Sequence, residues 1–277
     1  MTNLPGDSEP HRLTTSVLIT TYNRPDTLIK VLEALCRQTR PADEIIVADD
    51  GSGHETSDMI RGFEKGSLQT IEYVWQKDKG FRAARIRNKA IKRSTGEYII
   101  LLDGDCIPSG CFVQDHMALA ERKTFLQGKR ILVGKEVSDS FTYADTKTTV
   151  KLLRHALRGE LSNSHHLIRL PWFPALCNTK QSGIRSCNMS FFREDIFAVN
   201  GFNEDFTGWG REDSELAVRF YRHGLQRKSH PFMAICFHLW HEANSTDQLR
   251  ANDAILESCT RSKEYFCKNG LEKLDHE

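Results

Sequence analysis

The sequence lacks three features that would each point to a particular class of protein. No apolar run reaches the roughly 18 residues that a membrane-spanning helix needs. Neither sign of charge dominates, since 38 Lys and Arg face 37 Asp and Glu, whereas a nucleic-acid-binding domain is usually markedly basic. None of the eight cysteines forms a Cys-x-x-Cys pair, the spacing of many zinc and thiol redox sites. We therefore expect neither a membrane span nor a nucleic-acid partner.

The cysteines and the first residues bear on location. Most cysteines stand in apolar segments, as reduced buried cysteines do, and this favours a cytoplasmic protein. The start of the chain, residues 1–15, is polar, contains two prolines and resembles neither a signal peptide nor an anchor. With 277 residues, 39% of them hydrophobic, the chain is long enough for one large domain or two joined lobes.

The stretch around which the rest of the chain is organised is residues 97–106, EYIILLDGDC. Its unbroken apolar run predicts a buried strand. The strand ends in Asp103, Gly104 and Asp105, and ligands of open α/β sheets bind at the carboxyl ends of strands. One of two such carboxylates can bind Mg²⁺ or Mn²⁺ while the other holds a ribose hydroxyl or a metal-bound water. Taken alone, the triplet fits an ordinary Asp-Gly turn equally well.

Two earlier predicted strands, 16–20 and 44–48, also end in polar residues. The first is followed by Thr21, Tyr22, Asn23 and Arg24, and the second by Asp49, Asp50, Gly51 and Ser52. Helices at 26–35, 54–64 and 81–93, and a strand at 70–75, alternate with these strands, which predicts a parallel sheet. Polar clusters at one sheet edge suit a nucleotide: Tyr22 could face a base, and Asp50 could accept from a base N–H. The plainer interpretation is a rim aromatic and a turn.

The helix at 81–93 carries a basic face. Arginines and lysines recur at helical spacing, and the helix begins just after Lys79 and Gly80. Backbone N–H groups at a helix start favour anionic oxygens, and the arginine fork matches phosphate. We expect Lys92 and Arg93 to be solvated, but Arg87 and Asn88 to belong to the site.

The C-terminal half holds a second acidic motif, Trp209-Gly210-Arg211-Glu212-Asp213. A strand at 131–134, an irregular segment at 138–182 with one helix near 146–158, and a strand at 185–192 precede it. Trp209 offers a flat surface to a sugar ring, and the glycines allow close approach. Glu212 and Asp213 start a helix that ends at Gly224, so one could hold an acceptor hydroxyl while the other takes its proton. Acidic residues are also common in any first helical turn.

Two histidines follow the last predicted strand, 231–237. His238 or His241 could complete a metal site begun by Asp105, and the sequence does not choose between them. A helix over 246–267 is expected to pack on the domain, with contact to a membrane surface as the weaker alternative.

As a set, these motifs resemble the nucleotide half of family 2 glycosyltransferases. The matching segments are SVLITTYNR at 16–24, DDGS at 49–52, KGFRAARIRN at 79–88 and LDGD at 102–105. The Trp-Gly-x-Glu-Asp segment resembles that of β-1,4-galactosyltransferase-like regions and of bacterial chondroitin-type polymerases. The resemblance implies the GT-A fold, an α/β architecture with a mostly parallel Rossmann-like sheet and an acceptor-binding second lobe.

The resemblance also implies roles for individual residues. Tyr22 and Asp50 would hold the base of a UDP-sugar, within a donor site that also includes Thr21, Arg24, Lys79, Arg87, Asn88 and Asp103. Asp105 would bind Mn²⁺ or Mg²⁺. Asp213 would be the catalytic base, with Glu212, Trp209 and Gly210 contacting the acceptor.

We therefore expect an inverting, metal-dependent glycosyltransferase that moves a hexose or N-acetylhexosamine to a glycan or lipid-linked saccharide. Its expected setting is cell-surface polysaccharide or lipopolysaccharide synthesis, in the cytoplasm or at the inner face of the membrane. The expected divisions are a flexible N-terminus (1–14), a donor lobe (15–125), an acceptor lobe (126–245) and a C-terminal helix (246–277). The alternatives are a non-catalytic sugar-binding module and a nucleotidyltransferase, although the first strand lacks a glycine-rich loop after it.

Overall fold

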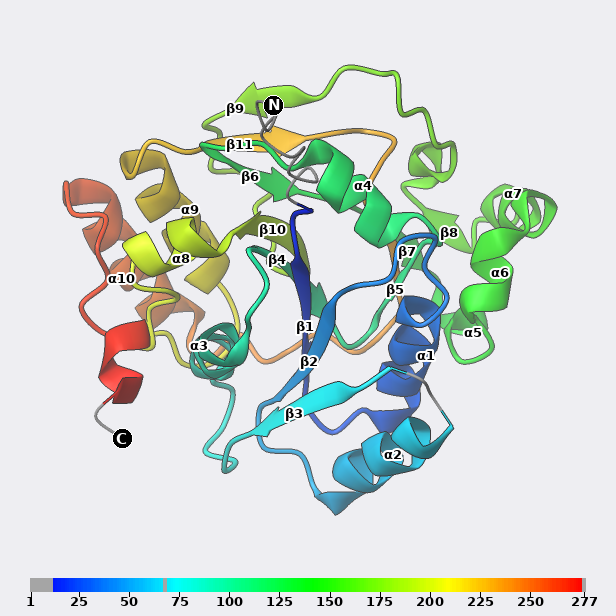
Figure 1. Ribbon diagram of the computed structural model, residues 1–277, viewed down its shortest axis with the longest axis horizontal. Helices are drawn as coiled ribbons and strands as arrows, with labels where there is room; N and C mark the ends of the chain where they lie inside the picture. Colours follow the sequence, from blue (N-terminus) through cyan, green and yellow to red (C-terminus); the bar gives the residue numbers. More distant parts are fainter. Residues whose placement is uncertain (1–11, 67–68, 276–277) are drawn as a thin grey trace, which may run out of the picture.

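The computed structural model, which describes residues 12–66 and 69–275, is an α/β protein with two sheets and flanking helices (Figure 1). Most of the N-terminus that we expected to be flexible lies outside the described residues. The strands are β1 (Thr15–Thr21), β2 (Glu44–Asp49), β3 (Ile71–Trp75), β4 (Tyr98–Asp103), β5 (Cys106–Pro108), β6 (Thr124–Gln127), β7 (Lys129–Val133), β8 (Leu161–Ser162), β9 (Leu176–Asn178), β10 (Asn188–Phe192), β11 (Gln226–Ser229) and β12 (Ile235–His238).

The helices alternate with the strands in the first half of the chain, as the sequence predicts. They are α1 (Pro25–Leu35), α2 (His54–Lys65), α3 (Ala83–Arg93), α4 (Phe112–Leu119), α5 (Lys135–Ser138), α6 (Tyr143–Lys147), α7 (Thr149–Leu157), α8 (Arg193–Ala198), α9 (Glu212–Arg222) and α10 (Leu249–Arg261), with 3₁₀ turns η1 (Ser164–Leu167) and η2 (Leu271–Asp275).

The large sheet has the order β3-β2-β1-β4-β10-β6-β11-β9. Strands β3, β2, β1 and β4 run parallel, as the alternation of strand and helix predicts. β10 then pairs with β4 in the antiparallel sense, with Asn188 opposite Leu102. This one pairing brings the C-terminal half of the chain against the strand that ends in Asp103.

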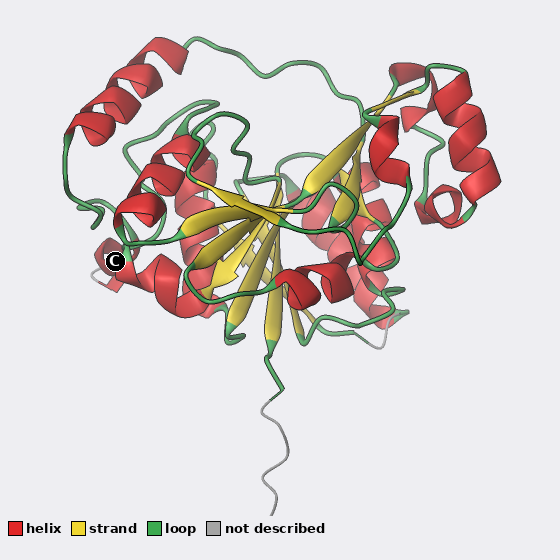
Figure 2. Ribbon diagram, turned by 90° about the horizontal axis from the view of Figure 1, so that it is seen from above, coloured by secondary structure: helices red, strands yellow, loops and turns green. Residues whose placement is uncertain are grey.

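Helices cover both faces of the large sheet (Figure 2). Val17 and Ile19 face a core shared with α1, α4 and the second sheet, whereas Leu18 faces a core shared with α3, α8 and α9. The opposite placement of neighbouring residues follows from the two-residue period of a strand. The second sheet, β5-β12-β7-β8, lies beside the first core.

Four predicted elements differ from the structure, the first being the strand expected at 185–192, which begins only at Asn188. The single helix expected near 146–158 is two helices, because Thr148 between α6 and α7 is extended at φ −104°, ψ 98°. The strand expected at 231–237 begins only at Ile235, since Ala234 adopts a positive φ of 56° that breaks the strand. The helix expected over 246–267 ends at Arg261, where Ser262 turns extended.

The two expected lobes share the large sheet. The boundary that we drew at residue 125 falls inside β6, which pairs with β10 and β11. Within the part of the chain that the structure describes, no helix is both long and apolar enough to cross a membrane. All eight cysteines are free, and Cys106, Cys187, Cys236 and Cys267 are buried.

Candidate active site

The ends of β1 and β4 are joined directly beside the Asp-Gly-Asp triplet. The Gly104 N–H donates to the carbonyl of Thr20 at 2.8 Å. A Cβ on Gly104 would lie 3.1 Å from that oxygen and from the Thr21 side chain, which is closer than nearly all such contacts. The missing side chain of Gly104 therefore allows the close approach of β1.

The second sheet gathers the three predicted metal ligands. The antiparallel pairing of β12 with β5 sets His238 opposite Cys106, next to Asp105. The His238 Nε2 lies 3.7 Å from Asp105 Oδ1, and the His241 Nε2 lies 3.5 Å from Asp105 Oδ2. One ligand atom from each of the three residues fits within 4.8 Å. The sequence did not indicate which histidine would join Asp105 in a metal site. The structure brings both histidines to Asp105, and the two are equally well placed.

The orientation of these histidines suits a cation. His241 donates from Nδ1 to the carbonyl of Glu242 at 2.6 Å, which leaves the lone pair of Nε2 facing Asp105. Burial lowers the pKa of His238, with Asp105 opposing this effect. Two imidazoles and a carboxylate form a donor set that fits Mn²⁺ well and Mg²⁺ less well, because imidazole favours transition metals. Arg24 also reaches this cluster, with its Nη1 3.7 Å from Asp105 Oδ2.

A buried arginine joins the two acidic motifs. Arg87, 4% exposed, donates from Nη1 to Glu212 Oε1 at 3.0 Å and from Nη2 to Asp103 Oδ1 at 3.4 Å. Its Nε donates to the hydroxyl of Thr20 at 3.2 Å. We expected Arg87 near a diphosphate, but its guanidinium is instead engaged with protein carboxylates. Arg87 therefore holds the start of α9 against the end of β4.

Asp213, which follows Glu212, has a strongly shifted protonation equilibrium. Burial raises the pKa of Asp213 to about 7, and the charge of Glu212 adds to this effect. Arg87 and the backbone of Ser214, whose N–H donates to Oδ1 at 2.7 Å, act in the opposite direction. For Asp103, burial raises the pKa in the same way, and Arg87 opposes the shift. A carboxyl poised near neutrality is what a general base requires.

The loop before α9 is held in an unusual conformation. Gly208, Gly210 and Arg211 all have positive φ, and at Arg211 this conformation is unfavourable for a side chain. Asn252 of α10, buried at 1% exposure, donates to the carbonyls of Thr207 and Gly210 at 3.1 and 3.0 Å. α10 therefore clamps this loop, and Trp209 is left 45% exposed at its tip.

The residues expected at the base lie at the ends of β1, β2 and β3. Tyr22 is 46% exposed and donates through its hydroxyl to Asp78 Oδ2 at 3.0 Å. Asp50 is 4% exposed and accepts from the Gln76 side chain at 2.5 Å and the Arg82 backbone at 2.6 Å. Lys79 is exposed on the loop before α3.

Two other donor-site candidates are buried. Thr21 is nearly buried, and its hydroxyl has no hydrogen-bond partner among the described residues. Asn88 lies outside the cluster, which corrects our expectation. It is fully buried, and its amide bonds both backbone groups of Phe202 at 2.8 Å and Glu204 Oε1 at 3.0 Å. Facing the core side of α3, it cannot also face the strand ends.

Three residues with a part in this geometry were missed in the sequence. Asp78 accepts a hydrogen bond that orients Tyr22, Thr20 accepts one from Arg87, and Asn252 donates to the loop that carries Trp209. The first two stand next to recognised motifs, so their positions gave some signal. Asn252 gave none, because nothing in the sequence relates α10 to residues 207–210.

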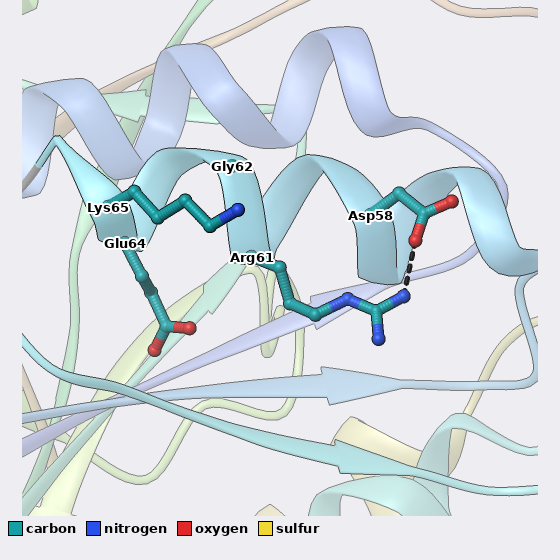
Figure 3. A pocket seen from close by; sticks show the side chains of 5 residues that line it. All are labelled: Asp58, Arg61, Gly62, Glu64 and Lys65. Carbon is teal, nitrogen blue, oxygen red and sulfur yellow. Dashed lines mark hydrogen bonds and ion pairs between the residues drawn. The ribbon is translucent and has the colours of Figure 1, made fainter.

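A surface depression on α2 is separate from this site. It is lined by Asp58, Arg61, Gly62, Glu64 and Lys65, and Arg61 pairs with Asp58 (Figure 3). α2 begins at the carboxyl edge of the sheet, so these residues of its later turns lie away from that edge. None of the predicted site residues lines the depression.

Comparison with known proteins gives the two motifs a common context. Residues 16–171 match the family model described as glycosyl transferase family 2, and residues 174–242 match the one described as N-terminal domain of galactosyltransferase. The chain is 31% identical over 228 residues to a chondroitin synthase of Escherichia coli, covering 77% of this chain and 33% of the relative. It is 30% identical over 224 residues to a hyaluronan synthase of Pasteurella multocida, covering 76% and 23%.

A third relative is a validoxylamine A glucosyltransferase of Streptomyces hygroscopicus subsp. limoneus, 31% identical over 229 residues, covering 76% of this chain and 48% of the relative. The chain thus spans about a quarter to a half of the length of these relatives.

Solved structures share the fold. The 1–349 fragment of S. aureus TarS has a TM-score of 0.62 at 15% identity, covering 89% of this chain and 65% of that one. The mannosyltransferase PcManGT of Pyrobaculum calidifontis, in complex with GDP-Man and Mn²⁺, has a TM-score of 0.57 at 19% identity, covering 91% and 64%. The GT-A fold that the motifs implied is confirmed, and the chain belongs to glycosyl transferase family 2.

Proposed function

We propose that this chain transfers a hexose or an N-acetylhexosamine from a UDP-sugar to a hydroxyl group of a glycan, with inversion at the anomeric carbon. The observation that carries the proposal is the Arg87 bridge, which sets the end of β4 beside the start of α9. A strand-end carboxylate suited to a donor and a carboxyl suited to a base therefore lie on one site.

The donor would lie along the carboxyl ends of β1, β2 and β4. Tyr22 would stack on the base and Asp50 would accept from its N–H, with Lys79 and Arg24 close to the diphosphate. The unpartnered hydroxyl of Thr21 supports a ligand at this edge, because shielded polar groups normally have a partner. Asp103, already oriented by Arg87, would receive a hydroxyl of the ribose or the sugar.

Asp105, His238 and His241 would hold Mn²⁺ or Mg²⁺. When bound there, the ion would neutralise charge on the departing diphosphate as a Lewis acid. PcManGT and a GalNAc-T7 structure, which share this fold, are described with Mn²⁺, and this supports the proposal of a bound cation.

The acceptor would lie on the other side of Asp103, against Trp209 and Gly210. Its hydroxyl oxygen forms a bond to the anomeric carbon while the bond from that carbon to the diphosphate oxygen breaks, and the electron pair leaves with UDP. Asp213 takes the hydroxyl proton. Glu212, with Oε1 held by Arg87, would accept a hydrogen bond from the acceptor through its other oxygen.

The wider setting is part of this proposal. The reaction would take place in the cytoplasm or at the inner face of the membrane, on a lipid-linked saccharide destined for the cell surface. The named products of two relatives, chondroitin and hyaluronan, are polysaccharides, which supports a polysaccharide or lipopolysaccharide pathway.

The test is a panel of nucleotide sugars incubated with the protein, Mn²⁺ and a mixture of oligosaccharide acceptors, with UDP release measured and the product anomer read by NMR. We expect acceptor-dependent release of UDP and a product of inverted configuration. Nucleotide-sugar binding without turnover would favour a non-catalytic module, and pyrophosphate release from a nucleoside triphosphate would favour a nucleotidyltransferase.

A further inference from the structure

α7 presents a face that the protein core does not use. Val150, Leu153 and Leu157 are 74%, 50% and 88% exposed and stand at i, i+3 and i+7, so they form one apolar stripe along the helix. Leu152, on the opposite side, is 6% exposed and packs in the core. In both views α7 lies at the edge of the molecule, away from the central sheet (Figures 1 and 2).

A basic stripe runs beside the apolar one. Lys151, Arg154 and Arg158 are exposed at the same spacing, next to the leucines rather than on the buried side. Residues 146–159 hold four Lys and Arg and no acidic residue, although the whole chain is almost neutral at +1. Lys151 faces Asp145 at 3.5 Å, but no described carboxylate pairs with Arg154 or Arg158.

We infer that α7 docks the protein on an anionic lipid surface. The aliphatic stripe would enter the boundary between headgroups and acyl chains, and the two arginines would meet anionic headgroups. The charge of the stripe indicates what binds there. A neutral apolar partner would leave the positive charges of Arg154 and Arg158 without counter-charges at the edge of the interface, whereas a layer of anionic headgroups supplies them.

The position of α7 gives such docking a consequence for the site. The segment that carries α7 is attached to the strand that ends in His238, because Phe141 packs on Phe237 with ring centroids 5.4 Å apart. The Trp240 N–H also donates to the hydroxyl of Ser138 at 2.9 Å. A lipid-bound α7 would therefore hold the candidate metal centre close to the membrane surface.

This inference stands apart from the proposed transfer reaction, since it is tested without donor or acceptor. The experiment is flotation of the full chain with vesicles of phosphatidylcholine alone and of phosphatidylcholine with phosphatidylglycerol. We expect binding to the anionic vesicles, weaker at high salt, and little binding to the neutral ones.

Two pairs of substitutions assign the surface. Arg154→Glu with Arg158→Glu, and Leu153→Ser with Leu157→Ser, should each weaken binding on the order of tenfold. The matched control, Arg250→Glu with Lys263→Glu, reverses two exposed charges in and just beyond α10 and should bind as the unmodified protein does. Melting temperatures should be unchanged in all three, because the altered side chains are exposed.

Four outcomes would overturn the inference. One is no binding to anionic vesicles, and another is binding that both α7 variants retain. The third is a dimer in solution that Leu153→Ser with Leu157→Ser dissociates while vesicle binding persists, which would mean that a second copy covers the stripe. Loss of binding only in the α10 control would place the lipid contact on that helix instead.

Discussion

Asp213 is the residue on which the proposed chemistry depends most directly. Asp213→Asn keeps the size of the side chain but cannot take a proton, so turnover should fall by roughly 10²–10⁴, the usual contribution of a positioned general base. Donor and metal binding should survive, because neither uses this carboxyl. Turnover is measured by UDP release and donor binding by calorimetry. Near-normal turnover with the donor still bound would assign the base to another residue.

The pKa of Asp213 gives the reaction a pH dependence with a definite sign. Burial and the charge of Glu212 raise the pKa to about 7, and the base must be ionised in the free enzyme. We therefore expect kcat/KM to be low at acidic pH, to rise through a midpoint near that value and to level off at higher pH. Glu212→Gln removes a neighbouring negative charge, so it should move the midpoint to lower pH. A profile that does not move in this variant would show that Asp213 is not the titrating group.

Arg87 acts through the carboxylates that it holds. Arg87→Met leaves Glu212 buried without its counter-charge, which typically costs about 3–5 kcal/mol of folding stability. Adding Glu212→Gln should recover most of that stability, measured by urea unfolding, because the unpaired charge is gone. Activity should stay low in the double variant, since Asp103 and the start of α9 are no longer joined. Full recovery of both would make Arg87 a structural residue alone.

At the scale of elements, α10 is expected to matter for the acceptor rather than the donor. Asn252→Ala removes two hydrogen bonds to the loop that carries Trp209, each contributing about 1 kcal/mol. The KM for the acceptor should rise severalfold while the affinity for UDP stays constant. Ser258→Ala, an exposed change on the same helix, is the control and should alter neither. Equal losses of acceptor and donor affinity would contradict a role confined to this loop.

The secondary structure was easier to predict from the sequence in the first half of the chain than in the second half. The strands and helices up to Asp103 follow the sequence closely, because unbroken apolar runs, helical apolar spacing and strand-end turns are local signals. α9 also ends as expected, with Gly224 at φ 94° just beyond it. The segment at 138–182 was harder, since its short helices are fixed by packing. α6 and α7 share Thr148, whose extended backbone no periodicity would indicate.

At the scale of the whole molecule, the metal centre joins segments from both halves of the chain. Asp105→Ala should abolish transfer and also the Mn²⁺-dependent rise in melting temperature with UDP, because a ligand stabilises the fold by mass action. His238→Ala and His241→Ala should each raise the Mn²⁺ concentration needed, since both face Asp105. Full transfer by the unmodified protein in EDTA would contradict the assignment, and an unchanged Mn²⁺ requirement in both histidine variants would remove β12 from the site.

The sequence alone determined the chemistry available at each strand end. An apolar run followed by Asp-Gly-Asp predicts carboxylates at a sheet edge, and Trp-Gly-x-Glu-Asp predicts a helix that begins with two acids. Those are consequences of neighbouring residues, and so was the identification of the family. The sequence did not determine which side chains meet across the molecule, because a contact such as Arg87 with Glu212 spans 125 residues.

Only the tertiary structure decided these contacts. The register of β12 against β5 brought both histidines to Asp105, and the antiparallel pairing of β10 with β4 brought the second acidic motif to the first. The orientation of α3 turned Arg87 toward the carboxylates and Asn88 into the core, although the two are adjacent in the chain. Neighbouring residues on a helix point in different directions, and the packing of the helix on the sheet decides which of them faces the site.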